Sequence, residues 1–132
     1  MSEQNVDVVR SMFASYRGGD VEAVIDVADS DIELRPAVVG GPEGAVYRGP
    51  EGIRAFFKDV DAAWEQFDIE AEEFRGFGDQ VLVLGRTRQV ARDGLELDDS
   101  AGWVFGMRSG KIARFDAFRS RAEALEAVGL RE

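Results

Sequence analysis

The sequence contains neither cysteine nor histidine among its 132 residues. Without cysteine the chain can form no disulfide and offers no thiolate to a metal or a substrate. Without histidine it lacks the commonest general acid or base near neutral pH and the commonest zinc ligand. Any proton transfer would use Asp, Glu, Tyr, Lys or water. No glycine-rich phosphate loop or metal-ligand spacing occurs either, so we expect no metal and no cofactor.

The sequence also lacks an apolar run of about 18 residues, the length that a membrane-spanning helix needs. Its N-terminus, MSEQNVDVV, does not show the basic and then apolar pattern of a secretory signal. We therefore expect a cytoplasmic protein. The formal charge of -10 repels polyanions, so we expect no binding to nucleic acid or membranes and favour a small-molecule partner.

The segment Gln80–Arg119 is the best-defined part of the chain. Its apolar and alternating runs predict three long antiparallel strands, which turn at Asp93-Gly94 and at Ser109-Gly110. At 132 residues and 45% hydrophobic composition, the chain can bury one real core. We therefore expect one domain that spans residues 1–132.

The first third of the chain predicts two helices and a strand. Apolar residues at helical spacing over residues 6–16 indicate a first helix, which Gly18-Gly19 ends. Asp20 is placed to cap a second helix from Val21 to about Ala28. A strand over Ile32–Val39 and a loop over residues 40–46 follow.

The rest of the chain predicts a third helix, a strand before the three-strand segment, and a last helix. Pro50 is favourable at a first helical position, and the stripe of the third helix is Ile53, Phe56, Phe57, Val60, Trp64 and Phe67. Asp68–Phe77 is expected to be a strand. Ser120 and Glu123 form a capping box for the last helix, which Gly129 ends.

This order of elements predicts an α+β fold with helices gathered on one face of a curved sheet, a cone with one open mouth. Four segments carry a family resemblance: Gly18–Ala23, Tyr47–Phe57, Gly78–Arg86, and Ser109–Ile112 with Glu123–Leu130. In this order the chain resembles the SnoaL-like branch of the NTF2-like superfamily, which includes polyketide cyclases, ketosteroid isomerases and limonene epoxide hydrolases. The resemblance covers nearly the whole chain. It implies an NTF2-like cone: a curved mixed or antiparallel sheet, three N-terminal helices on its concave face, and a short C-terminal helix.

Members of that superfamily catalyse unrelated reactions, so function depends on which residues share the concave face. A two-residue turn at Asp93-Gly94 pairs Arg92 with Leu95 and places Arg88 opposite Asp99. At Ser109-Gly110 a two-residue turn pairs Met107 with Ile112, whereas a three-residue loop pairs Met107 with Lys111. We prefer the three-residue loop, because the family resemblance implies that the inward positions of the last strand are Ala113, Phe115, Ala117 and Arg119.

On this register the concave face is expected to carry Leu82, Leu84, Arg86, Arg88, Asp99, Ala101, Trp103, Phe105, Met107, Phe115, Ala117 and Arg119. The outer face is expected to carry Val81, Val83, Thr87, Gly102, Val104, Ile112, Arg114, Asp116 and Phe118. An outer face this apolar predicts a homodimer. The alternative is a register shifted by one residue, in which this face is the core.

The candidate ligand-binding residues are Tyr47, Trp64, Arg86, Arg88, Trp103, Phe105, Phe115 and Arg119, and the candidates for catalysis are Asp99, Tyr47 and Arg86. We favour a small-molecule-binding protein whose hydrophobic pocket carries arginines, with a hydrophobic acid or acidic phenol as ligand. The alternative is a cyclase- or isomerase-like enzyme acting on a hydrophobic oxygenated ligand. The arginines could instead pair with Asp98 and Asp99 as surface ion pairs, and the aromatic residues could be core.

The family's catalytic acids are missing from this chain. The resemblance to limonene epoxide hydrolases implies carboxylates at two positions that here hold Arg88 and Ala117, although the family's arginine is present as Arg86. The positions of the ketosteroid isomerase residues fall approximately at Arg35, Met12 and the Ala101–Trp103 region, which supply neither the base nor the oxyanion donors.

We predict that the protein neither hydrates simple epoxides nor isomerises steroid enones. Epoxide hydrolysis of this kind needs a carboxylate that deprotonates water and an acid that protonates the leaving oxygen, and both are missing. Product analysis after incubation with either substrate type measures this. Turnover that disappears when a pocket residue is replaced would contradict the assignment of these positions.

Overall fold

The computed structural model describes residues 2–36 and 46–130. The elements in chain order are α1 (Ser2–Arg17), α2 (Val21–Asp26), β1 (Ala28–Arg35), β2 (Tyr47–Arg48), α3 (Gly49–Ala63), β3 (Trp64–Phe77), β4 (Gln80–Ala91), β5 (Glu96–Arg108), β6 (Lys111–Phe118) and α4 (Arg121–Ala127). The described residues form a six-stranded sheet in the order β2-β1-β6-β5-β4-β3. β1 runs parallel to β6 and the other neighbours are antiparallel, so the sheet is mixed.

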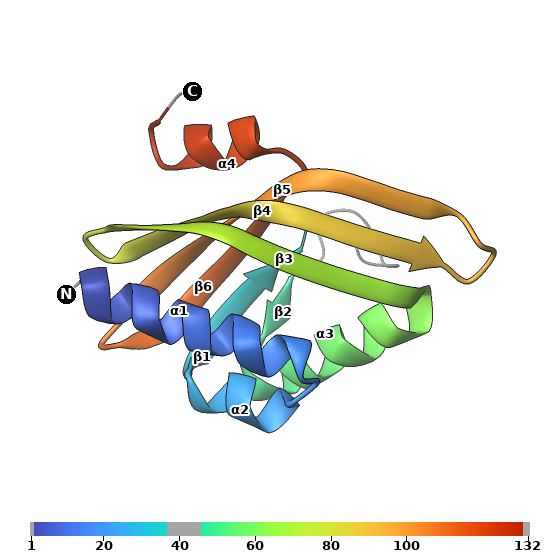
Figure 1. Cartoon of the computed structure of the whole chain (residues 1–132). Coiled ribbons are helices and arrows are strands. Elements are labelled where there is room, and N and C mark those ends of the chain that lie inside the picture. The colour runs from blue at the N-terminus through green and yellow to red at the C-terminus, as the bar shows by residue number, and fades with distance from the viewer. Residues whose placement is uncertain (1, 37–45, 131–132) are drawn as a thin grey trace.

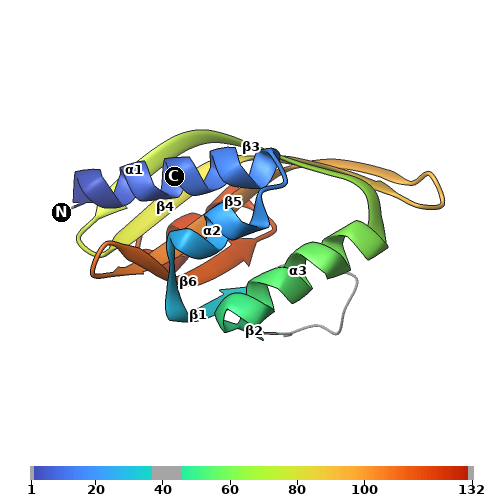
Figure 2. The same cartoon turned by 90° about the horizontal axis from the view of Figure 1, so that it is seen from below.

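The helices cover the sheet unequally. α1, α2 and α3 lie on one side of the sheet, which we call the concave face, and α4 lies on the opposite, convex side (Figures 1 and 2). The main core, including Val9, Phe13, Ile53 and Trp103, fills the space between the concave face and the first three helices. The predicted α+β arrangement is confirmed. Among the described residues, no helix is both long and apolar enough to cross a membrane.

The predicted N-terminal caps of two helices are confirmed. Asp20 Oδ1 accepts a hydrogen bond from the backbone N–H of Ala23 at 3.1 Å, and Ser120 Oγ accepts one from Glu123 at 3.2 Å. The boundaries of the second helix and first strand differ from the prediction, because α2 ends at Asp26 and β1 already begins at Ala28. Residues 37–39 of the predicted strand and residues 40–45 of the predicted loop lie outside the described part of the chain.

The third helix is shorter than its apolar stripe predicted. α3 begins at Gly49, with Pro50 in its first turn, but Trp64 is already extended (φ -125°, ψ 139°) and starts β3. A β-bulge between Trp64 and Gln66 adds a residue, so Trp64 and Phe67 share the concave face, with ring centroids 6.2 Å apart. A three-residue spacing that is typical of a helix here comes from a bulged strand.

The turn between β4 and β5 is a three-residue loop, and the predicted two-residue turn is wrong. The N–H of Ala91 donates to the carbonyl of Leu95 at 2.8 Å, and Gly94 (φ 96°) donates to the carbonyl of Ala91 at 2.9 Å. A type I turn followed by a glycine with positive φ commonly closes such loops. Val83 rather than Leu84 therefore lies opposite Trp103.

This shift of one residue reverses the predicted faces of β4. The residues that share the concave alternation are Val81, Val83, Thr87 and Gln89, whereas Leu82, Leu84, Arg86 and Arg88 share the convex one. The alternative register, in which the supposed outer residues Val81 and Val83 are core, is the correct one for β4. The predicted residues of β5, namely Ala101, Trp103, Phe105 and Met107, do lie in the main core.

The turn between β5 and β6 has two residues, which is the alternative that we did not prefer. Met107 pairs with Ile112, and Ser109 and Gly110 both have positive φ, 51° and 79°, as a type I′ turn requires. A β-bulge then makes Ala113 an extra residue, so Phe115 still lies opposite Phe105. The predicted inward positions of Phe115 and Ala117 therefore hold for a different reason, and Ile112 joins the core instead of the outer face.

The convex face is partly covered by the chain itself. Leu82, Leu84 and Val104 form a second small core with Ala124 and Leu125 of α4. Much of the apolar surface that predicted a homodimer is therefore either on the concave side or beneath α4. The homodimer stays a prediction, without support from this face.

We predict that Gly102→Ala destabilises the protein. A Cβ at Gly102 would collide with Cβ of Ala124 and so displace α4, and overpacking of this kind costs about 1–3 kcal/mol in free energy of unfolding. Urea unfolding measures it. The control is Gly18→Ala, whose Cβ would find its nearest atoms at 3.7 Å, so this variant should be close to wild type. Equal stability of the two variants would contradict the packing of α4 described here.

Candidate functional site

A cavity of about 350 Å³ opens on the concave side of the sheet, and we call it the sheet cavity. Its wall comes from α3 and from the four consecutive strands β3 to β6, with Phe67, Trp103 and Phe115 as aromatic members. The polar side chains on the concave alternation of this wall are Thr87, Gln89, Asp99 and Arg119. The cavity therefore joins a largely apolar wall to a few hydrogen-bonding groups.

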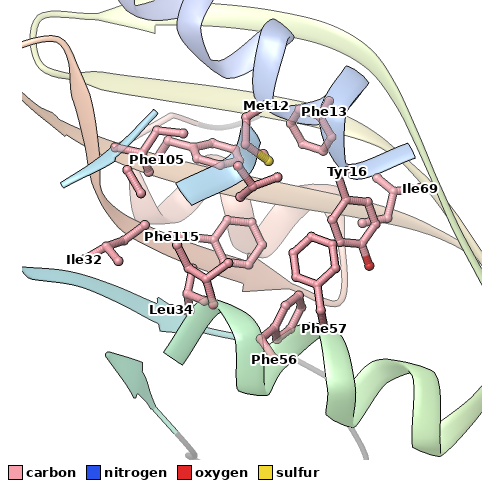
Figure 3. Close-up of a pocket in the computed structure, with 14 residues that line it drawn as sticks. Met12, Phe13, Tyr16, Ile32, Leu34, Phe56, Phe57, Ile69, Phe105 and Phe115 are labelled. Carbon is pink, nitrogen blue, oxygen red and sulfur yellow. The ribbon is translucent and has the colours of Figure 1, made fainter. Parts of the chain in front are cut away.

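A smaller compartment of about 50 Å³ lies in the core beside the sheet cavity (Figure 3). Phe56, Ile69 and Phe115 line both spaces. Aromatic rings pack around it from α1, α3, β5 and β6, and the Phe105 and Phe115 centroids are 5.1 Å apart. The compartment exposes an apolar surface and could take only the apolar end of a ligand.

The polar groups of the wall sit on neighbouring strands. Thr87 on β4 lies directly opposite Asp99 on β5, and Gln89 follows two residues along β4. Gln89 is only 7% exposed, and its Nε2 atom has no hydrogen-bond partner among the described residues. The predicted register missed Thr87 and Gln89. The signal that could have found them is the Arg-Thr-Arg-Gln order, because charged arginines prefer the solvent side of such a strand.

Several predicted site residues do line the cavity. Trp103, Phe115, Asp99 and Arg119 border the sheet cavity, and Phe105 borders the inner compartment. Their roles toward a ligand remain predictions.

The prediction that Arg86 and Arg88 point into this cavity is wrong. Arg86 bonds Asp98 at 2.8 Å and Arg88 bonds Glu96 at 2.7 Å, in ion pairs whose side chains are half exposed. Asp98 raises the pKa of Arg86 through a hydrogen bond and its charge. Both arginines instead border a separate pocket of about 660 Å³ that is lined by the end of α1 and by β3, β4 and β5. The surface ion pairs that we considered as the alternative form here, with Asp98 and Glu96 as the partners.

Trp64 and Tyr47 lie beside the cavity without bordering it. Trp64 packs against Phe67, and its Nε1 atom is buried without a partner among the described residues. Tyr47 packs on Phe56, and its hydroxyl donates to Asp59 Oδ2 at 2.6 Å. The Tyr47 hydroxyl is therefore already hydrogen-bonded to the Asp59 carboxylate.

The site lacks the acids of the epoxide hydrolase resemblance on the corrected register as well. The β4 positions that face the cavity hold Thr87 and Gln89, and the β6 position holds Ala117. Among the described residues, no cluster of three or more acidic side chains could hold a metal ion. What the wall can do is exclude water from an apolar molecule and hydrogen-bond its oxygens.

An α+β fold with a six-stranded mixed sheet and a cavity against its N-terminal helices is that of an NTF2-like protein. The model of the SnoaL-like domain matches residues 9–115, and the chain belongs to this family. A comparison with curated proteins finds no match.

Solved structures agree with this fold. TerC, co-crystallised with polyporic acid, is 23% identical, with a TM-score of 0.79 over 93% of this chain and 96% of that one. An NTF2-like protein of unknown function from Burkholderia pseudomallei is 20% identical, with a TM-score of 0.79 over 96% and 98% of the two chains. A putative polyketide cyclase from Xanthomonas campestris is 15% identical, with a TM-score of 0.76 over 97% and 98%. At these identities the likeness shows the fold alone.

Both tyrosines of the chain hold their protons tightly. Burial, followed by the hydrogen bond and charge of Asp59, raises the pKa of Tyr47 from 10.0 to about 12. Burial, with a smaller effect from Asp68, raises the pKa of Tyr16 still further. Neither hydroxyl is therefore a base near neutral pH, which removes one role that Tyr47 could have played.

We predict that the protein loses stability in alkaline solution. A tyrosine whose pKa is raised on folding stabilises the fold fully below its unfolded pKa, and this contribution is lost as pH rises through the folded pKa. For Tyr47 the window runs from pH 10.0 to about 12. Urea unfolding across this window measures the loss, and absorbance titration of tyrosinate gives the pKa.

The Asp59→Asn variant tests the contribution of Asp59. Without the carboxylate charge, the pKa of Tyr47 should fall part of the way toward 10.0, because burial, the larger cause, is unchanged, while the pKa of Tyr16 stays high. A Tyr47 pKa that does not change in this variant would show that Asp59 is not the partner.

Proposed function

We propose that this SnoaL-like protein binds a small, hydrophobic, oxygenated molecule in the sheet cavity. The observation that carries the proposal is the cavity itself, whose volume of about 350 Å³ falls within the range of about 300–1,000 Å³ of small-molecule sites. Its composition supports the same reading, since aromatic walls with a few polar groups are typical of such sites.

A hydrophobic acid or acidic phenol is the ligand class that we propose to test first. A protein of the same fold was co-crystallised with polyporic acid. In this chain Arg119 borders the cavity and Asp99 brings the opposite charge to the same wall. Arg86 and Arg88 pair with carboxylates away from the cavity, so the cavity favours an anion less than it would with three inward arginines. Neutral ligands should therefore be tested beside the acids.

An enzyme of the cyclase or isomerase kind is the second candidate. Asp99 favours it, because this is the one carboxylate among the described residues that line the sheet cavity. A carboxylate beside an apolar ligand could remove a proton next to a carbonyl. The two candidates differ in one measurement: proton exchange at a bound ketone would depend on Asp99 in an enzyme and would be absent from a binding protein.

We predict that aromatic compounds quench the fluorescence of Trp103. The matched probes are 2-naphthoic acid, its methyl ester and 2-naphthylmethylamine, and calorimetry measures their affinities. Trp103 lines the cavity and Trp64 does not, so quenching should persist in Trp64→Phe and disappear in Trp103→Phe.

Two further variants test the charges. Arg88→Ala should leave the difference between acid and ester unchanged, whereas Arg119→Gln should reduce it if the acid binds beside Arg119. Absence of binding by all three probes would contradict the proposed function. An acid that binds no better than its ester would remove the anionic ligand class alone.

A further inference from the structure

Among the described residues that line the sheet cavity, Gln89 is the one whose side chain has a buried polar atom without a hydrogen-bond partner. It lies near the end of β4, next to the edge strand of the sheet, opposite Phe67 of β3 on one side and Leu97 of β5 on the other. Its side chain is more than nine-tenths buried and borders the cavity. A carboxamide held between two apolar neighbours has no obvious reason to be buried there for packing.

The Nε2 atom of Gln89 is buried and makes no hydrogen bond to any described residue. Thr87 and Asp99 share its face of the sheet, yet neither bonds it. A buried amide without a partner destabilises the fold, and the large majority of buried polar side chains in proteins are paired. Trp64 Nε1 is the other buried atom without a partner in the described part of the chain, but Trp64 does not line the cavity, so within that part Gln89 is the residue that points to a ligand.

We propose that the Gln89 carboxamide turns toward the molecule that occupies the sheet cavity and donates a hydrogen bond from Nε2 to an accepting oxygen of that molecule, a carbonyl or phenolic oxygen. This assignment rests on the proposed function and narrows its ligand class. It adds a neutral donor on β4 to the acceptor that Asp99 supplies on β5. The ligand would place its accepting oxygen toward Gln89 and its apolar part toward the compartment behind Phe115.

The stability of the ligand-free protein separates this role from a structural one. If Gln89 held the fold together, Gln89→Leu would destabilise it, because a bonded partner would be left unpaired. If the amide of Gln89 is unpaired until a ligand binds, Gln89→Leu removes an unsatisfied amide from apolar surroundings. The variant should then be at least as stable as wild type. Urea unfolding without ligand gives this answer independently of any binding.

The binding experiment uses two bicyclic probes that differ in one oxygen, 1-tetralone and tetralin. The wild type should bind the ketone about tenfold more tightly, the usual effect of a hydrogen bond whose site is otherwise unpaired. Gln89→Leu should lose this preference and bind the two probes alike. Because a carboxamide does not titrate, the preference should also stay constant between neutral and mildly acidic pH.

Gln66→Leu is the matched control. Gln66 is an exposed glutamine on neighbouring β3 whose amide bonds Asp68 instead of facing the cavity, so its replacement should leave the ketone preference intact. Fluorescence quenching of Trp103 or calorimetry gives the affinities. The side-chain NH₂ signal of Gln89, assigned by its absence from Gln89→Leu, should shift with 1-tetralone and not with tetralin.

Each outcome decides the assignment. A ketone preference that survives in Gln89→Leu, or a clear loss of ligand-free stability in that variant, overturns it while the proposed function stands. If neither probe binds the wild type, the proposed function fails for this ligand class and the role of Gln89 falls with it. A preference lost only in Gln89→Leu, with stability kept, supports it.

Discussion

The register of β4 on β5 decides what the concave face of this protein carries. Val81 to Leu84 are four consecutive residues with no exposed surface, two of them packed under the N-terminal helices and two under α4. Their hydrophobicity alone does not say which pair faces which side, because a strand buried on both faces has no alternation. The loop at Gly94 supplies the missing information by closing in three residues rather than two.

The chemistry of the cavity follows from that loop. A shift of one residue would exchange Thr87 and Gln89 for Arg86 and Arg88 on the concave wall. In the observed register the arginines reach carboxylates on β5 in half-exposed surroundings, where a charge costs little to hold. The wall keeps neutral hydrogen-bonding groups instead, together with Asp99 and Arg119. Such a wall selects ligands by the position of their oxygens more than by their charge.

Elements with a local signal could be predicted from the sequence, and those fixed by pairing between strands could not. Asp20 and Ser120 bond backbone groups three residues away, so their caps depend on nothing distant. The bulges at Glu65 and at Ala113 depend on the partner strand and leave no comparable mark in the sequence. At β6 the error in the predicted turn shifts the register by one residue, and the bulge at Ala113 shifts it back, so the predicted position of Phe115 is correct. At β4 no bulge cancelled the error, and Gln89 was missed.

A sheet that is packed on both faces can leave a cavity on one of them. Part of the concave face borders the sheet cavity and is not packed against other side chains, and the amide of Gln89 has no partner among the described residues. Both features lower the stability of the fold. On the convex face α4 fully buries Leu82 and Leu84 around Ala124, and burial of a leucine side chain contributes about 1.5–3 kcal/mol. The central strands are thus held from behind by a core whose fully packed members, Leu82, Leu84, Val104, Ala124 and Leu125, do not line the cavity. The wall residues are therefore free to differ in polarity, as Thr87, Gln89, Asp99 and Ala117 do, without loosening the strands that position them.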